Sequence, residues 1–272
     1  MSENQTPNNK PLIVAIIIIA ILLLCGCLVI MGVALSGLLG AFSLPWSDAF
    51  DGQVKATETL EKTFSVTTPA SLSLNVNVGD VIIQTGDAQE IHIYGVKQVW
   101  GPNSRQAEQY LDDFEVRLGQ TTSGDIEIET EMPLSLRRVR QAPHIDLEIT
   151  VPRDTQLDLN INVGKIEVTG VQGKFEIQAD VGDVTLRDVR FEKDSQIRSN
   201  VGNIELRLPP DSAFTFTAQS DVGDIDVDFD VRNERSEKKV VGGNIEGEIG
   251  TSPTVHVELR TNTGDIDIRK ER

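Results

Sequence analysis

The chain has 272 residues, and its 25 Lys and Arg against 42 Asp and Glu give a formal net charge of −17 at pH 7. This acidic balance disfavours nucleic-acid binding. Both cysteines, Cys25 and Cys27, lie in an apolar segment near the N-terminus. The rest of the chain therefore forms no disulfide and depends on packing for its stability.

The apolar segment, residues 12–42, contains no charged side chain. A helix needs about 20 apolar residues to cross the hydrocarbon core of a bilayer, so this segment predicts one transmembrane helix. A cleaved signal peptide is one alternative, but its apolar region is usually only about 7–15 residues long. A lipoprotein signal is another, because residues 24–27 (Leu-Cys-Gly-Cys) resemble a lipobox.

The charges beside this segment predict its orientation. Lys10 precedes it, whereas Asp48 and Asp51 follow it, so the positive-inside rule places the N-terminus in the cytoplasm. We therefore expect a single-pass protein of the cell membrane, with residues 12–42 in contact with lipid and the C-terminal domain outside. The predicted segments are a cytoplasmic tail (1–11), the transmembrane helix (12–42), a polar linker (43–59) and an external domain (60–272).

The external domain shows the alternation of apolar and polar residues that is typical of half-buried strands. Phe64 and Val66 begin this pattern. It continues through alternate apolar residues between Leu72 and Val78 and recurs along most of the chain. The pattern predicts an all-β domain.

A short motif, Val-Gly-Asp-Ile or a near relative, repeats along the domain. From Gly164 onward the repeated glycines are spaced by 18, 20, 21, 20 and 21 residues. A spacing near twenty is typical of stacked structural units. The glycines of the motif and its weaker copies are Gly79, Gly164, Gly182, Gly202, Gly223, Gly243 and Gly264.

The glycines are expected to form corners between two strands of one unit. Val222 and Ile225 are three residues apart, and simple pleating would place them on opposite faces of a sheet. We expect the corner at Gly223 to turn both toward the core, because Gly adopts backbone conformations that other residues avoid. Each unit then forms one rung of a parallel β-solenoid of about eight rungs. An antiparallel sandwich of short strands is the structural alternative.

Residues 97–143 interrupt the repeat, and we expect an insertion or cap. Asn103 or Ser104 is suited to cap a short helix in which Ala107, Tyr110, Leu111 and Phe114 follow helical spacing. Strand patterns resume near Ile126 and again near Ile145. The loop between them carries a basic cluster that could contact lipid phosphates or an anionic polymer, although a solvated loop is the simpler interpretation. The cluster consists of Arg137, Arg138 and Arg140.

Several segments resemble a known bacterial family. They are residues 151–155 (Val-Pro-Arg-Asp-Thr), 164–168 (Gly-Lys-Ile-Glu-Val), 170–173 (Gly-Val-Gln-Gly) and the Gly-Asp-Val triplets at 79–81 and 182–184. The domain is similar to the bacterial "putative adhesin" family, whose function is not established. The resemblance covers about residues 60–269 and implies a membrane-anchored β-solenoid displayed outside the cell. It brings no catalytic residues.

One acidic ladder is a candidate metal site. Asp224, Asp226, Asp228 and Asp230 alternate with apolar residues, which lines four carboxylates on one strand face. Carboxylate oxygens are ligands that Ca²⁺ prefers, so the ladder could bind calcium. A solvated outer face is the simpler interpretation, because the spacing matches no EF-hand or calcium-binding nonapeptide repeat.

No other motif predicts a cofactor or a catalytic site. His92, His144 and His256 share no spacing typical of a zinc site. The sequence contains no phosphate-binding loop before a helix, no nucleophile elbow and no cysteine outside residues 12–42. We therefore expect a protein that is not an enzyme and has no cofactor other than a possible calcium ion.

The sequence leaves three hypotheses for function. The first is a membrane-anchored, cell-surface adhesion or binding module that contacts an extracellular or envelope protein or polysaccharide. The second is a regulatory ectodomain that senses envelope stress with a membrane partner, since the tail of residues 1–11 is too short for a signalling domain. The third is a carbohydrate-active enzyme, because parallel β-helices can carry such sites.

Overall fold

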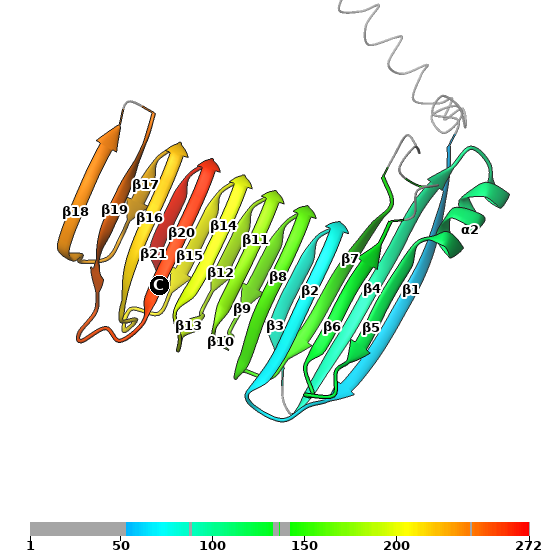
Figure 1. The fold of residues 1–272 in the computed structure, drawn as a ribbon, viewed down its shortest axis with the longest axis horizontal. Helices are drawn as coiled ribbons and strands as arrows, with labels where there is room; N and C mark the ends of the chain where they lie inside the picture. The colour runs from blue at the N-terminus through cyan, green and yellow to red at the C-terminus, as the bar shows by residue number, and fades with distance from the viewer. Residues whose placement is uncertain (1–52, 87–88, 133–135, 137–141, 240, 272) are drawn as a thin grey trace, which may run out of the picture. The chain divides into compact units, whose positions relative to one another are not determined.

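The computed structural model describes residues 53–86, 89–132, 136, 142–239 and 241–271, and Figure 1 shows their fold. This part of the chain is all-β apart from one short helix, α2 (Ser104–Asp113). None of its helices is long and apolar enough to cross a membrane. The predicted transmembrane helix, residues 12–42, lies outside the described residues.

Two large sheets and one small sheet contain the described strands. The nine-stranded sheet has the order β1 (Val54–Ser65), β4 (Glu90–Gly101), β7 (His144–Val151), β3 (Val81–Thr85), β9 (Ile166–Thr169), β12 (Val184–Arg187), β15 (Ile204–Leu208), β21 (Ile266–Lys270) and β17 (Ile225–Val227). The ten-stranded sheet has the order β18 (Arg232–Lys239), β19 (Gly242–Ile249), β16 (Phe214–Val222), β20 (His256–Thr263), β14 (Ser195–Val201), β11 (Phe175–Val181), β8 (Thr155–Val163), β2 (Ala70–Val78), β6 (Ile126–Glu131) and β5 (Glu115–Gln120). The small sheet pairs β10 (Gln172–Gly173) with β13 (Arg190–Phe191).

Each repeat forms one rung with a strand in each large sheet. In the β8–β9 rung, β8 pairs in parallel with β2 and β11, and β9 pairs in parallel with β3 and β12. Inward-facing side chains such as Leu159, Ile161, Ile166 and Val168 are at most 1% exposed and belong to one continuous core. The middle of the domain is therefore a parallel solenoid, as the repeat predicted.

The rungs do not stack in chain order, which corrects the simplest interpretation of the regular spacing. The rung β20–β21 lies between β14–β15 and β16–β17, although it comes last in the sequence. The reason is the hairpin β18–β19, which adds to β16 in antiparallel register before the chain returns. Among the described residues, six rungs have a glycine corner, and β6 and β7 form a further level beside β2 and β3.

The valines before the corner glycines are also placed differently from our expectation. Val163, Val181, Val201 and Val222 are 44–50% exposed, so they do not face the core. In the β8–β9 rung the last inward residue before the corner is Ile161, and the next is Ile166. The chain bends between these two residues, and Asn162 and Val163 both lie on the outside of the bend. The valines thus form an exposed row along the corner.

The first strand and the insertion complete the other end of the stack. β1 begins at Val54, so it extends into the segment that we expected to be linker (43–59). β4 pairs in antiparallel register with both β1 and β7. The helix α2 begins after Asn103, whose Oδ1 accepts from the backbone N–H of Gln106 at 3.0 Å. Ala107 and Phe114 are buried, so this segment packs against the stack as the sequence predicted.

Candidate functional site

The predicted corner glycines form one continuous column. Gly79, Gly164, Gly182, Gly202, Gly264 and Gly223 have φ between 145° and 156°. Their neighbours lie so close that a Cβ atom on Gly164 would overlap the carbonyl oxygen of Gly79, and the same holds from rung to rung. The column therefore has a structural role, because only glycine allows backbones to approach this closely at such a φ.

Gly243 does not belong to this column, which corrects the seventh predicted corner. It lies inside β19, where it pairs with Ser220 in antiparallel register. The positive φ in this region, 130°, belongs to its neighbour Gly242. The sequence motif misled here because the hairpin β18–β19 replaces a rung.

The residue after each corner glycine connects adjacent rungs. The carboxylate of Asp183 accepts from the backbone N–H of Asn203 at 2.8 Å, and Asn203 Oδ1 accepts from the N–H of Asp265 at 2.8 Å. Asp265 in turn accepts from the N–H of Asp224 at 2.8 Å. These side chains satisfy backbone donors that the bend leaves unpaired, which explains the preference for Asp and Asn at this position.

The four candidate calcium ligands lie at the β17 end of the nine-stranded sheet. Asp224, Asp226, Asp228 and Asp230 are all exposed, in agreement with one solvent-facing row. Asp226 lies 3.4 Å from Arg269, and Asp230 lies 3.8 Å from Lys270. Within the described residues no group of three acidic, His or Cys side chains is arranged to hold a metal ion. The basic cluster Arg137, Arg138 and Arg140 lies outside the described residues.

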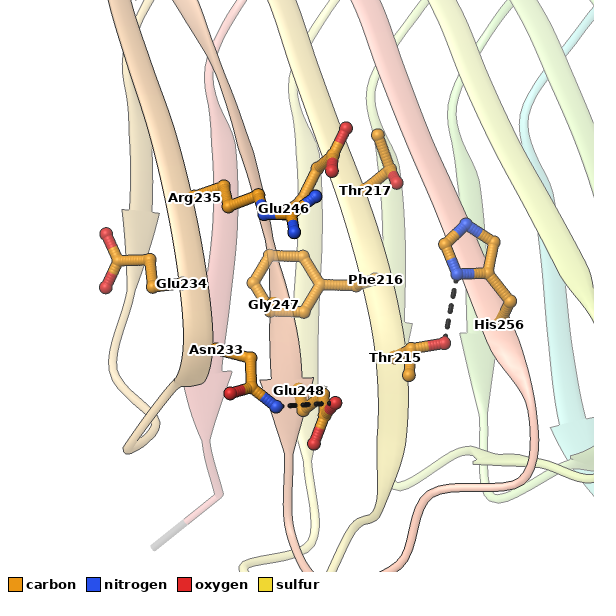
Figure 2. Close-up of a pocket in the computed structure, with 10 residues that line it drawn as sticks. All are labelled: Thr215, Phe216, Thr217, Asn233, Glu234, Arg235, Glu246, Gly247, Glu248 and His256. Atoms are coloured by element: carbon orange, nitrogen blue, oxygen red, sulfur yellow. Dashed lines mark hydrogen bonds between the residues drawn. The ribbon is translucent and has the colours of Figure 1, made fainter.

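A depression with a volume of about 560 Å³ runs along the outer side of β16 (Figure 2). We name it the β16 groove. The outward side chains of β16 that line the groove are the short Thr215 and Thr217. On one side they pair with Glu248 and Glu246 of β19, and on the other with His256 and Glu258 of β20. Short threonines between longer side chains thus create the groove.

Hydrogen bonds fix several side chains of the groove (Figure 2). Thr215 Oγ1 lies 3.0 Å from His256 Nδ1, and Asn233 Nδ2 donates to Glu248 Oε1 at 2.9 Å. The backbone N–H of His256 donates to Asp194 at 2.8 Å. The walls are therefore held in place by residues of five strands or their loops.

The charge of the groove is dominated by carboxylates. Glu234, Glu246 and Glu248 line it together with a single arginine, Arg235. Beside it, burial of the Glu258 carboxylate acts to raise its pKa, but hydrogen bonds from Arg198 and Gln196 and the nearby positive charges outweigh burial. The pKa of Glu258 therefore lies below its ordinary value, and this wall stays negatively charged at neutral pH.

Two smaller depressions continue the groove across the same sheet face. One, of about 260 Å³, shares His256 with the groove and extends to Glu176 and Gln196 on β11 and β14. The next, of about 140 Å³, shares Glu176 and Gln196 and reaches Asp158 on β8. The outer face of the ten-stranded sheet thus presents a continuous polar track.

Comparison with known proteins places this architecture in a family. The sequence model of the family described as Toastrack DUF4097 matches residues 71–269. The chain belongs to the DUF4097 family. This confirms the resemblance that the sequence motifs indicated.

Two solved structures resemble this DUF4097 chain. One is a "putative cell adhesion protein" from Clostridium sporogenes, with 15% identity, a TM-score of 0.57, and coverage of 79% of this chain and 100% of the other. At this level of identity the likeness shows a shared fold. The other is a "putative adhesin" from Bacteroides fragilis, with 13% identity, a TM-score of 0.31, and coverage of 79% and 97%. None of the curated proteins compared with the chain matches it.

The groove of this DUF4097 domain presents several hydrogen-bonding groups to the solvent. Thr215 Oγ1 lies 3.1 Å from the backbone carbonyl oxygen of Val255 and 3.0 Å from His256 Nδ1, so two acceptors are in reach of its proton. A nucleophile needs a base that accepts its proton and a third group that orients the base. The described residues provide no such third group at His256. What the groove offers is rows of hydrogen-bonding and charged groups at the spacing of adjacent strands, about 4.8 Å.

The sequence alone does not reveal this groove. The alternation Phe214-Thr215-Phe216-Thr217 shows that two threonines face outward. However, the walls come from β19 and β20, and the insertion of β20 between β14 and β16 is not visible in the repeat spacing. The groove depends on which strands are neighbours, and no local pattern reports this.

Proposed function

We propose that this protein is a non-enzymatic binding module, held at the cell membrane by residues 12–42 and displayed outside the cell. The observation that carries the proposal is the β16 groove, a solvent-open groove with acidic walls on a sheet of stacked strands. The fold that it shares with a protein described as a "putative cell adhesion protein" supports the same role.

The charge of the groove indicates the kind of partner. Glu234, Glu246 and Glu248 contribute three carboxylates against the guanidinium of Arg235. Complementary charge steers association and selects partners, so we infer a partner with positive groups, either a basic protein surface or an amine-bearing polysaccharide. Repetition of polar side chains along the track allows many weak contacts to add up.

Binding is tested with residues 53–272, because these residues form a compact unit whose buried core lies between Phe64 and Ile268. The probes are poly-lysine and a chitosan oligomer, with a fully acetylated chitin oligomer as the neutral control. The double variant Glu246→Gln with Glu248→Gln should weaken binding of the cationic probes about tenfold. The matched control is Glu167→Gln with Glu205→Gln, which removes the same charge from the nine-stranded sheet.

The control variant should change binding by less than about twofold, because its residues lie on the outer face of the other sheet. Equal losses in the two double variants would show that the groove is not the binding surface and that net charge alone attracts the probes. A loss confined to the groove variant supports the proposal.

Anchoring and orientation are tested with the full chain in bacterial cells. We expect the protein in the membrane fraction, with a C-terminal tag that antibody reaches on intact cells and an N-terminal tag that it reaches only after lysis. Release of the domain into the medium, or an N-terminal tag exposed on intact cells, contradicts this part of the proposal.

A further inference from the structure

The nine-stranded sheet ends at β17 with an incompletely covered strand. Ile225 occupies the same register position as Ile266, Ile204, Val184 and Ile166, which are all 0% exposed. Ile225 itself is only half-buried, and so is Val227, whose counterparts Ile268, Leu206, Leu186 and Val168 are also 0% exposed. The inward apolar row, which is fully buried in the other rungs, is therefore partly exposed to solvent at β17.

The backbone of β17 is unpaired on the same side. In every earlier rung the inward residue after the corner donates its N–H to the next strand: Val184 to Asn203, Ile204 to Asp265 and Ile266 to Asp224, at 2.9 Å each. Ile225 is next in this series, and no backbone carbonyl among the described residues accepts its N–H. The earlier corner glycines also donate their N–H to the next rung, as Gly264 does to Val222 at 2.9 Å. No backbone carbonyl among the described residues accepts the N–H of Gly223. An unpaired row of backbone groups is a template for a further strand.

The opposite sheet continues past this point and leaves a space beside β17. β19 and β18 extend the ten-stranded sheet by two strands, whereas the nine-stranded sheet stops. A pocket of about 120 Å³ lies where the next strand of the shorter sheet would lie. Its lining includes Ile225, the half-buried Ile245 and Asn244, whose buried Oδ1 has no described hydrogen-bond partner. The space thus offers an apolar wall to an incoming strand.

The charges around this edge indicate what fills it. Asp224, Asp226 and Asp228 lie on the exposed side of β17, and Glu237 also lines the pocket. A second copy of β17 is disfavoured, because it would place aspartates beside aspartates, and like charges on neighbouring strands are destabilising. An incoming strand with Lys or Arg on its outer face would instead meet opposite charges.

We propose that the β17 edge accepts an extended strand of another protein, in which apolar residues alternate with Lys or Arg. The apolar residues cover Ile225, Val227 and Ile245, and the basic residues pair with the aspartates of β17. The backbone of the strand accepts from the N–H groups of Gly223 and Ile225. This is strand addition to a free sheet edge, a known mode of peptide recognition. The site goes beyond the proposed function and is separate from the β16 groove.

The test uses residues 53–272 and a peptide of alternating Val and Lys, seven residues long. Binding is measured by calorimetry, and hydrogen exchange of the Ile225 amide is followed by NMR. We expect saturable binding that slows exchange at Ile225. A scrambled peptide of identical composition, and one N-methylated at alternate amides on its pairing edge, should both bind at least about tenfold more weakly.

Protein variants localise the effect. Ile225→Pro removes the outward N–H, and Asp224→Lys reverses an edge charge, so each should weaken peptide binding about tenfold. Asp112→Lys, at an exposed site on α2, makes the same charge change elsewhere and should leave binding within about twofold. The groove variant Glu246→Gln with Glu248→Gln should leave the peptide-induced slowing of exchange at the Ile225 amide unchanged, which separates this site from the groove.

Three results would overturn the proposal. Equal binding of the ordered and scrambled peptides would show attraction by charge alone. An Ile225 amide that is fully protected without peptide would show that the edge is already paired. Concentration-dependent dimers that protect the same amide would identify a second copy of the chain as the occupant.

Discussion

The β14–β15 rung and the β16–β17 rung carry almost the same motif but lie in different surroundings. Val201-Gly202-Asn203-Ile204 and Val222-Gly223-Asp224-Ile225 both bend at a glycine with φ near 150°. Ile204 is fully buried between strands on both sides, whereas Ile225 has a neighbouring strand of its sheet on one side only. The motif thus decides how the chain bends, and the neighbouring strands decide how much each residue contributes to stability.

The largest effect should come from the feature that the two rungs share. Gly164→Ala introduces a Cβ that overlaps the carbonyl oxygen of Gly79, at a φ of 147°. Neither backbone can move without breaking the column, so we expect a loss of about 4 kcal/mol or more in the free energy of unfolding, or failure to fold. Denaturant unfolding of residues 53–272 measures this loss.

Gly119→Ala is the matched control, because the Cβ at this position meets nothing within 4 Å. It should change the free energy of unfolding by less than about 0.5 kcal/mol. A Gly164→Ala variant as stable as Gly119→Ala would mean that the corner column is not close-packed.

A matched pair of isoleucines tests the difference between the rungs. Ile204→Ala should cost about 3 kcal/mol, because it leaves a cavity in a core with no exposed surface. Ile225→Ala should cost about 1 kcal/mol, because its surroundings are already partly open to solvent. Urea unfolding of both variants measures the difference. Equal losses would show that something covers β17 in solution.

The pH dependence of stability tests the ion pairs on the ten-stranded sheet. The pKa of Glu258 is lower in the folded chain, where Arg198 Nη2 donates to its carboxylate at 3.0 Å. The stabilisation is therefore present above the unfolded pKa, near the ordinary value of 4.5, and is lost as the pH falls through the folded pKa.

Glu258→Gln should consequently be less stable than the unaltered protein at pH 7, and the difference should shrink steadily below about pH 4.5. Thermal unfolding across pH 3–7 measures it. A difference that is constant across this range would show that Glu258 contributes through packing and not through its charge.

Calcium should have the smallest effect. Two of the four candidate ligands, Asp226 and Asp230, already face Arg269 and Lys270. We expect the same midpoint of thermal unfolding with calcium and with chelator. An ion bound at a hundred times its dissociation constant would add about 2.7 kcal/mol, so a clear rise in the midpoint would support the calcium hypothesis instead.

Local features of the fold were accessible from the sequence. The helix after Asn103, the strand at Ile126 and the strand at Ile145 each depend on a cap or on alternation within a few residues, and the structure contains all three. The exposure of Val163 could not be predicted in this way. Its alternation with Ile161 suggested a buried side chain, but the bend begins one residue earlier than the glycine suggests.

The candidate sites were harder to predict from the sequence, because they depend on neighbours that are distant in the chain. The β16 groove needs His256 beside Thr215, which is 41 residues away in the sequence. The free edge of β17 exists because β21, and not the following hairpin, became its partner. The repeated motif predicted seven corners where the described residues have six, and its spacing does not give the order in which the rungs stack.

Glycine at the corners and alternation along the strands are local requirements of the backbone, so the sequence alone predicts bent β-strands around an apolar core. The tertiary structure decided the order of the rungs, the groove along β16 and the open edge at β17. These features arise where a hairpin pairs locally before the last rung returns, and pairing between distant segments is fixed by the packing of the whole stack.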